Sequence, residues 1–410
     1  MQTSAIPVFD AHLDLAYLAV NRRDMLAPLS TLAAEPDRVG STGNPPAPLH
    51  PPAAITLHAL RHSPVRFALA TIFTEPVVSP QERDAPEKYL APDVDDAHRA
   101  GRAQLEVYLD WAERGHIQID LRRSLHVDRG TGEVRGGMGV SEAAPPSPSR
   151  LVERALARDA AGWRPSMPPG IVSERSVSTL PPLHVGVLIE NADPIRSPEE
   201  LGWWKERGVV AIGLAWAKAS RYAGGNSTDL GVSMLGKDLV REMDRLRIVH
   251  DVSHLSERAF DELLSLTARP VVASHSNCRA LLGGENAANR QRHLTDAQIR
   301  AIASRGGVIG LNLFAPFVRS GLEGAQRPSI DDAIAHVEHV CSLTGSRAHV
   351  GLGSDMDGGL SAARLPDGID SPADLPKLLG ALARRGWSDR DLRGFACENW
   401  VRSLAAAMNA

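Results

Sequence analysis

The chain has 410 residues, of which 43% are apolar and 23% charged, and its formal net charge is −4. This balance excludes a disordered chain and gives no sign of a nucleic-acid partner. The longest apolar runs have strand length or little more, so no membrane span is expected. The three widely spaced cysteines exclude a disulfide framework and a zinc site built from thiolates.

The first residues, MQTSAIPVFDAHLD, lack the basic stretch and the apolar run of a signal peptide. We therefore expect a cytoplasmic protein. The length permits several ordinary domains, or one large α/β barrel with insertions.

Eight short apolar runs predict strands, and several are apolar throughout, as in strands that are buried on both faces. Their ranges are 5–11, 66–73, 183–190, 209–216, 247–253, 270–275, 306–313 and 349–354. Periodic patterns predict helices over 93–119, 236–246, 256–267, 295–305 and 331–343. Thr295 and Asp296 provide a cap and an acidic first turn for one of these helices.

The alternation of strand and helix favours a (β/α)8 TIM barrel, which we take as a single domain over residues 1–410. A doubly wound open sheet uses the same alternation and is the alternative. Two segments rich in Pro, Gly and Ala, at about 24–65 and 128–182, do not fit a minimal barrel. We expect both to be long surface insertions.

Most of the predicted strands end in a histidine or a carboxylate, at the face where barrel enzymes keep their active sites. These candidates are His12, Asp14, Glu190, His254, His275 and Asp355. His12 and Asp14 are two residues apart, so in an extended strand both side chains lie on one face. Taken alone, each residue is better explained by a hydrogen-bonded pair or a buried ion pair than by a metal. Burying all of them together without a ligand, however, would be costly.

Imidazole and carboxylate ligands together suit a divalent cation such as zinc. Three His, one Asp and one Glu are enough for two ions if Glu190 bridges them, and two such ions can share a hydroxide and clamp a carbonyl. Asp355 follows a turn with two glycines, GLGS, and is the candidate to take a proton from the bridging water. Asp357 is expected to cap a turn.

Several segments resemble the membrane dipeptidase (renal dipeptidase) family of zinc metallopeptidases, within the amidohydrolase superfamily. They are FDAHLD (9–14), the glutamate after LHVGVLI (183–189), DVSHLS (251–256), VVASHSNCRAL (271–281), RHLTDAQIRAI (292–302), HVGLGSDMDGG (349–359) and GFACENWVRSL (394–404). The likeness runs from end to end apart from the two insertions. DVSHLS and GSDMDGG are quite specific when they occur in this order.

The resemblance implies a TIM barrel with two zinc ions per chain and a dipeptide as substrate. It places His12 and Asp14 on one zinc, His254 and His275 on the other, and Glu190 between them. It also implies that Asp355 is the catalytic acid–base and that Arg292 binds the substrate's C-terminal carboxylate. The family's tendency to form dimers raises a homodimer as an assembly state.

One residue departs from the family pattern. The family usually has a histidine after the fourth strand, near the substrate carbonyl, and Trp216 stands there in this chain. An indole N–H can donate a hydrogen bond but cannot carry a positive charge. Because loss of one oxyanion donor can cost about 10²–10³ in rate, this change puts ordinary dipeptidase activity in question. Lys218 and Arg221 are the neighbouring cations that would compensate.

Three functions are therefore compared. The first is a zinc-dependent dipeptidase that uses a metal-bridged hydroxide. The second keeps the metal site but acts on another amide, such as an N-acyl amino acid or a lactam. The third is a non-catalytic, metal-containing binding protein. The first is preferred because all five ligand positions and Asp355 are present.

Overall fold

A barrel of parallel strands forms the centre of the protein. The computed structural model describes residues 6–32, 53–121, 182–284, 289–359 and 361–409. Within these ranges eight parallel strands lie side by side in the order β10-β11-β1-β2-β6-β7-β8-β9. They are β1 (Val8–Leu13), β2 (Val65–Ile72), β6 (Leu183–Ile189), β7 (Val209–Gly213), β8 (Val249–Asp251), β9 (Val271–Val272), β10 (Ile309–Leu311) and β11 (Val350–Leu352). A parallel bridge between Ala273 and Ile309 joins the two ends of this order, so the sheet closes.

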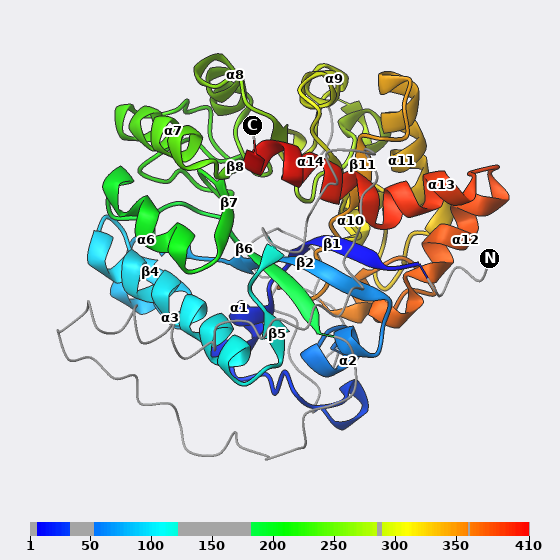
Figure 1. The fold of residues 1–410 in the computed structure, drawn as a ribbon, viewed down its shortest axis with the longest axis horizontal. Helices are drawn as coiled ribbons and strands as arrows, with labels where there is room; N and C mark the ends of the chain where they lie inside the picture. The colour runs from blue at the N-terminus through cyan, green and yellow to red at the C-terminus, as the bar shows by residue number, and fades with distance from the viewer. Residues whose placement is uncertain (1–5, 33–52, 122–181, 285–288, 360, 410) are drawn as a thin grey trace, which may run out of the picture.

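Most helices follow one another in chain order around the strands, and the C-terminal helix lies across the barrel (Figure 1). The helices are α1 (Leu15–Val20), α2 (Leu57–Arg61), α3 (Val94–Glu113), α6 (Leu201–Glu206), α7 (Met234–Leu246), α8 (Glu257–Leu266), α9 (Asp296–Ser304), α10 (Ala315–Val318), α11 (Ile330–Thr344), α12 (Pro376–Arg384), α13 (Asp389–Arg393) and α14 (Asn399–Asn409). Thr295 caps α9 in a capping box with Gln298, as its position predicted. The (β/α)8 barrel is therefore confirmed, and the open sheet is excluded.

Three shorter strands lie outside this ring. β3 (Glu75–Val77) and β4 (Lys88–Leu90) pair with each other, and β5 (Ile117–Gln118) pairs with the start of β6. The β3–β4 sheet follows directly after β2, at the end of the barrel where the predicted site residues lie. It therefore contributes to the rim of the site rather than to the barrel.

The regular strands end earlier than the apolar runs predicted. Strand β9 covers only Val271–Val272, although the run continues to residue 275. Beyond it, the N–H of Ser274 donates to Oδ1 of Asp251 over 2.9 Å instead of to a backbone carbonyl. A side-chain acceptor thus replaces the ladder where the chain enters the barrel mouth.

The C-terminal helix α14 packs directly on the barrel strands. Trp400 stacks on Phe9 with ring centroids 6.0 Å apart, and its indole N–H donates to the carbonyl of Leu352 over 2.9 Å. A Cβ on Gly351 would lie 2.4 Å from the Trp400 indole nitrogen, so only glycine permits this contact. The end of the chain is therefore part of the barrel core.

The two predicted insertions have different outcomes. Apart from Pro182, the segment at 128–182 lies outside the described residues. In the other segment, Ala54, Ile55, Leu57 and Leu60 are fully buried. That part of 24–65 therefore packs into the core, although the whole segment was expected to lie on the surface. Among the described residues, no helix combines the length and apolar character needed to cross a membrane.

Candidate metal centre and active site

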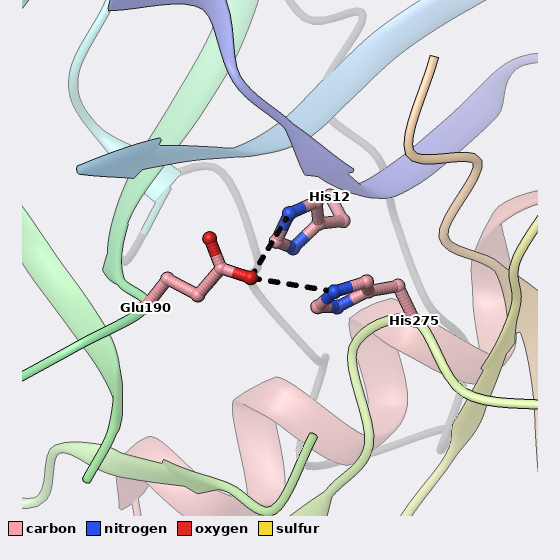
Figure 2. A group of neighbouring side chains, drawn as sticks. All are labelled: His12, Glu190 and His275. Carbon is pink, nitrogen blue, oxygen red and sulfur yellow. Dashed lines mark ion pairs between the residues drawn. The ribbon is translucent and has the colours of Figure 1, made fainter. Parts of the chain in front are cut away.

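The five residues predicted to bind metal converge at the C-terminal ends of β1, β6, β8 and β9. Figure 2 shows His12 and His275 pointing at the same carboxylate oxygen of Glu190. Oε1 of Glu190 lies 3.0 Å from Nε2 of His254, 3.5 Å from Nε2 of His275 and 3.8 Å from Nε2 of His12. Oδ2 of Asp14 lies 3.7 Å from Nε2 of His12. The barrel thus gathers residues that are up to 263 positions apart in the chain into one cluster.

The hydrogen bonds around two of these histidines assign their tautomers. Nδ1 of His254 lies 3.0 Å from Oδ1 of Asn226, and Nδ1 of His275 lies 2.7 Å from the hydroxyl of Ser274. That hydroxyl donates to Asp251, so it accepts from His275. Both rings therefore carry their proton on Nδ1 and present a lone pair on Nε2.

The two Nε2 atoms of His254 and His275 are only 2.9 Å apart. With both protons on Nδ1, two lone pairs face each other beside a carboxylate oxygen, which is repulsive unless a cation lies between them. Burial lowers the pKa of both rings well below its usual range, and the charges of Arg292 and His12 lower it further. Neutral imidazoles of this kind are the ordinary metal ligands.

The spacing of the donors also fits a tetrahedral ion. Zinc bound at about 2.1 Å places its ligand atoms about 3.4 Å from one another. The donor distances of 2.9–3.8 Å lie on both sides of that value. Gly358 supports the arrangement, because a Cβ there would lie 2.7 Å from Oδ2 of Asp14 and 2.1 Å from Oδ1 of Asp355. The residues present therefore fit a metal centre.

The cluster carries more negative charge than its buried position tolerates. Burial raises the pKa of both Glu190 and Asp355, and the neighbouring carboxylate of Asp14 raises it further. Burial alone would lower the pKa of His12, but Glu190 and Asp14 outweigh it and raise that pKa to about 10. The site thus attracts positive charge, as a cation site must.

Two matching aspartate–serine pairs hold the backbone next to the cluster. Oδ1 of Asp251 accepts the N–H of Ser274 over 2.9 Å, and its Oδ2 accepts the Ser274 hydroxyl. In the same way, Oδ1 of Asp10 accepts the N–H of Ser354 over 2.8 Å, and its Oδ2 accepts the Ser354 hydroxyl. Each serine directly precedes a site residue, so each pair fixes the backbone that carries that residue.

Two site residues have left-handed backbones, with φ of 66° at His254 and 58° at Asp355. This conformation costs a non-glycine residue roughly 1–2 kcal/mol and is concentrated at functional positions. In both loops this conformation lets the side chain face the cleft. Nδ2 of Asn312, which follows β10, donates to Oδ2 of Asp355 over 2.9 Å and holds that carboxylate in place.

Arg292 is buried and lies beside the cluster. Its guanidinium donates to the Ser276 hydroxyl over 3.0 Å and to the carbonyl of His275 over 2.7 Å. Its Nε has no hydrogen-bond partner among the described residues. Arg292 also lines the cleft above the cluster, so a positive charge faces the space where a substrate would lie.

A cleft of about 1390 Å³ opens over the cluster, and Trp216 is in its wall. The indole lies 6.0 Å from the His254 ring, measured between centroids. Lys218 also lines the cleft and pairs with Glu75 over 3.1 Å. Arg221 is not among the lining residues and donates to the carbonyl of Ile195 over 2.7 Å. Lys218 alone of the two predicted cations therefore reaches the cleft.

Asp357 does more than cap a turn. It is fully buried, and its Oδ2 accepts the N–H groups of Ala54 and Ile55, each over 2.7 Å, as well as a hydrogen bond from Arg23. It thereby ties the segment before β2 to the loop that carries Asp355. Burial raises the pKa of Asp357 to about 6.

The sequence patterns did not identify several supporting residues. Asp10 and Asp251 stood out as polar strand ends without an assigned role, and Asn312 is a polar residue in an otherwise apolar run. Nothing in the sequence singled out Asn226, which contacts His254, or Thr71. The hydroxyl of Thr71 donates to Asp14. Their roles depend on which strands are neighbours.

The family model of the membrane dipeptidases, peptidase family M19, matches residues 182–410, which is more than half of the chain. The chain belongs to this family. It is therefore a metallo-dipeptidase by class, and the third function considered above, a non-catalytic protein, is set aside. The matched range contains Glu190, His254, His275, Arg292 and Asp355.

Individual relatives agree with this membership. An uncharacterized protein of Klebsiella pneumoniae, from the region 5′ of pqqA, is 33% identical over 205 residues, covering 48% of this chain and 72% of the relative. An uncharacterized dipeptidase of Schizosaccharomyces pombe is 31% identical over 178 residues, covering 43% of this chain and 41% of the relative.

Solved structures confirm the fold. Dipeptidase AC, a metallopeptidase, is 22% identical with a TM-score of 0.66, covering 99% of this chain and 100% of that chain. A Rhodobacter sphaeroides metallopeptidase, bound to a phosphinate mimic of the dipeptide L-Ala-D-Ala, is 24% identical with a TM-score of 0.65, covering 98% and 99%. At this identity the likeness establishes the barrel.

Proposed function

We propose that this member of the family is a zinc-dependent dipeptidase that holds two zinc ions per chain. The observation that carries the proposal is that Nε2 of His254 and Nε2 of His275 lie 2.9 Å apart and both face one oxygen of Glu190. His254 and His275 would hold one ion, His12 and Asp14 the other, and Glu190 would be shared. When bound, the ions supply a Lewis acid for the scissile carbonyl and lower the pKa of water.

Asp355 is the proposed proton carrier. Its carboxylate takes a proton from the attacking water and delivers it to the leaving amine when the peptide bond breaks. Asn312 orients it through Oδ2, and the absence of a side chain on Gly358 leaves room for Oδ1. Because burial raises its pKa, the carboxyl group is a better proton acceptor than one in water.

Arg292 is proposed to bind the C-terminal carboxylate of the substrate. Two contacts to Ser276 and His275 hold the guanidinium rigidly, and the Nε–H has no partner among the described residues. Pairing with a substrate carboxylate would satisfy this buried donor. Trp216 is proposed to offer its indole N–H on the carbonyl side, in place of the family's histidine.

Metal analysis and turnover of a dipeptide panel test the proposal. We expect two zinc ions per chain and cleavage of dipeptides. Asp355→Asn should retain both ions and lose about 10²–10⁴-fold in kcat. Asp261→Asn, on the exposed face of α8, is the matched control and should change neither. Fewer than one metal per chain, or full activity in Asp355→Asn, would overturn the assignment. Turnover of N-acyl amino acids or lactams without dipeptide cleavage would favour the other amide substrates instead.

A further inference from the structure

Three aromatic side chains form one side of the cleft. Phe73 lies between the other two: its ring meets Tyr17 edge-on at 5.7 Å and meets Trp216 edge-on at 5.0 Å, measured between centroids. All three line the cleft. We call Tyr17, Phe73 and Trp216 the aromatic wall. It ends beside the proposed metal ligand His254, which lies next to Trp216.

Phe73, the middle residue of the wall, and Arg292 belong to opposite sides of the barrel ring, whereas Trp216 follows β7, two positions from β9. Phe73 directly follows β2, and Arg292 comes after β9. In the closed ring of eight strands, β2 and β9 are four positions apart, which is the largest separation possible. The proposed metal ligands come from strands on both sides of this line. A substrate whose carboxylate is bound by Arg292 therefore extends across the metal centre towards the aromatic wall.

Charged residues that line the cleft near the wall have polar partners of their own. Lys218 pairs with Glu75 over 3.1 Å, and Lys88 pairs with Asp84 over 2.7 Å. Glu87 accepts a hydrogen bond from Asn21 over 2.9 Å. A charged side chain of the substrate would have to compete with these partners, whereas an apolar side chain would only displace water from the rings.

We propose that the aromatic wall binds the side chain of the substrate's N-terminal residue and selects aromatic and large aliphatic residues there. This inference rests on the proposed dipeptidase function and on the role of Arg292, which together fix the direction of the substrate. Edge-to-face contacts with the rings of the wall add to the gain from burying the side chain. The family's histidine at the position of Trp216 would not provide the same apolar surface.

Two matched dipeptide series test the inference. In the first, the N-terminal residue varies (Phe-Gly, Leu-Gly, Ala-Gly, Glu-Gly, Lys-Gly), and in the second the C-terminal residue varies (Gly-Phe, Gly-Ala). We expect kcat/KM for Phe-Gly to exceed that for Ala-Gly at least about tenfold, with Glu-Gly and Lys-Gly lowest. The ratio of Gly-Phe to Gly-Ala should be much smaller.

Substitutions in the wall locate the effect. Trp216→Ala should reduce the Phe-Gly to Ala-Gly ratio about tenfold, and Trp216→Phe should retain most of it. Because a ratio of two substrates is independent of the fraction of folded enzyme, instability of a variant does not alter the result. Trp203→Ala is the control, because Trp203, on α6, is outside the cleft lining and the guanidinium of Arg207 lies over its ring.

The results distinguish a failure of this inference from a failure of the proposed dipeptidase function. If no dipeptide is cleaved, the proposed function fails. If dipeptides are cleaved but the N-terminal series is flat, or if Trp216→Ala leaves the ratio unchanged, the aromatic wall is not the selecting surface. A preference that appears only in the C-terminal series would contradict the assignment of the wall to the N-terminal residue of the substrate.

Discussion

Ser274 and Asp251 are joined by two hydrogen bonds, one from the serine N–H and one from its hydroxyl. The same hydroxyl lies 2.7 Å from Nδ1 of His275, so it links the carboxylate to the imidazole. Such partners orient a metal-binding histidine and increase its basicity. Ser354 and Asp10 repeat the arrangement next to Asp355.

Ser274→Ala should therefore weaken zinc binding. The substitution removes the acceptor for the Nδ1 proton of His275, and loss of such partners typically costs 10–100-fold in metal affinity. Competition with a chelator of known affinity measures this change directly on the purified protein.

Ser354→Ala is the matched comparison, because it removes the equivalent hydroxyl beside Asp355. It should lower kcat while leaving zinc affinity close to that of the wild type. Equal zinc affinities in Ser274→Ala and the wild type would show that the Asp251 pair does not act through His275.

Gly358→Ala should disrupt the site without disrupting the fold. Its Cβ would lie 2.1 Å from Oδ1 of Asp355, so that carboxylate must move. Displacement of a catalytic group by about 1 Å costs on the order of 10²-fold in rate. Gly202→Ala, in α6 with open space around its Cβ position, is the control and should keep full activity. Wild-type kcat/KM in Gly358→Ala would contradict the tight packing inferred here.

Asp357→Asn should destabilise the protein by about 3 kcal/mol, because it leaves the buried charge of Arg23 without its carboxylate and weakens two backbone hydrogen bonds. Urea unfolding measures the loss. Asp238→Asn breaks an exposed ion pair with Arg241 on α7 and should change the free energy of unfolding by less than about 1 kcal/mol. Equal losses in the two variants would argue against the anchoring role of Asp357.

His336 should make stability depend on pH. Burial lowers its pKa from 6.5 to about 4, and its Nδ1 accepts the N–H of Cys278 over 3.1 Å. The unfolded chain therefore binds a proton before the folded one does, so stability falls as the pH drops from about 6.5 to 4. The full loss is about 3 kcal/mol.

His336→Gln cannot titrate and should remove this part of the acid dependence. Thermal unfolding of both proteins between pH 7 and 4 gives the comparison. Parallel stability curves over that range would show that the ring of His336 does not titrate as expected.

The sequence was sufficient for the barrel and for the residues at its mouth. Parallel strands are buried on both faces, so they read as short apolar runs, and each of the eight predicted runs contains an observed strand or most of one. His12, Glu190, His254, His275 and Asp355 stood out because all of them follow the ends of predicted strands, and burying them together without a ligand would be costly. These signals are local, so no tertiary structure was needed to read them.

Only the tertiary structure decided how those residues are supported and what surrounds them. The Asp251–Ser274 and Asp10–Ser354 pairs span 23 and 344 residues of the chain, and the aromatic wall combines side chains that follow three different strands. Gly358 matters because of its closeness to Asp14, which follows β1, and Asp357 because it accepts hydrogen bonds from the segment before β2. Such contacts depend on which strands are neighbours and on how the loops between them run, and a sequence pattern over a few residues carries neither.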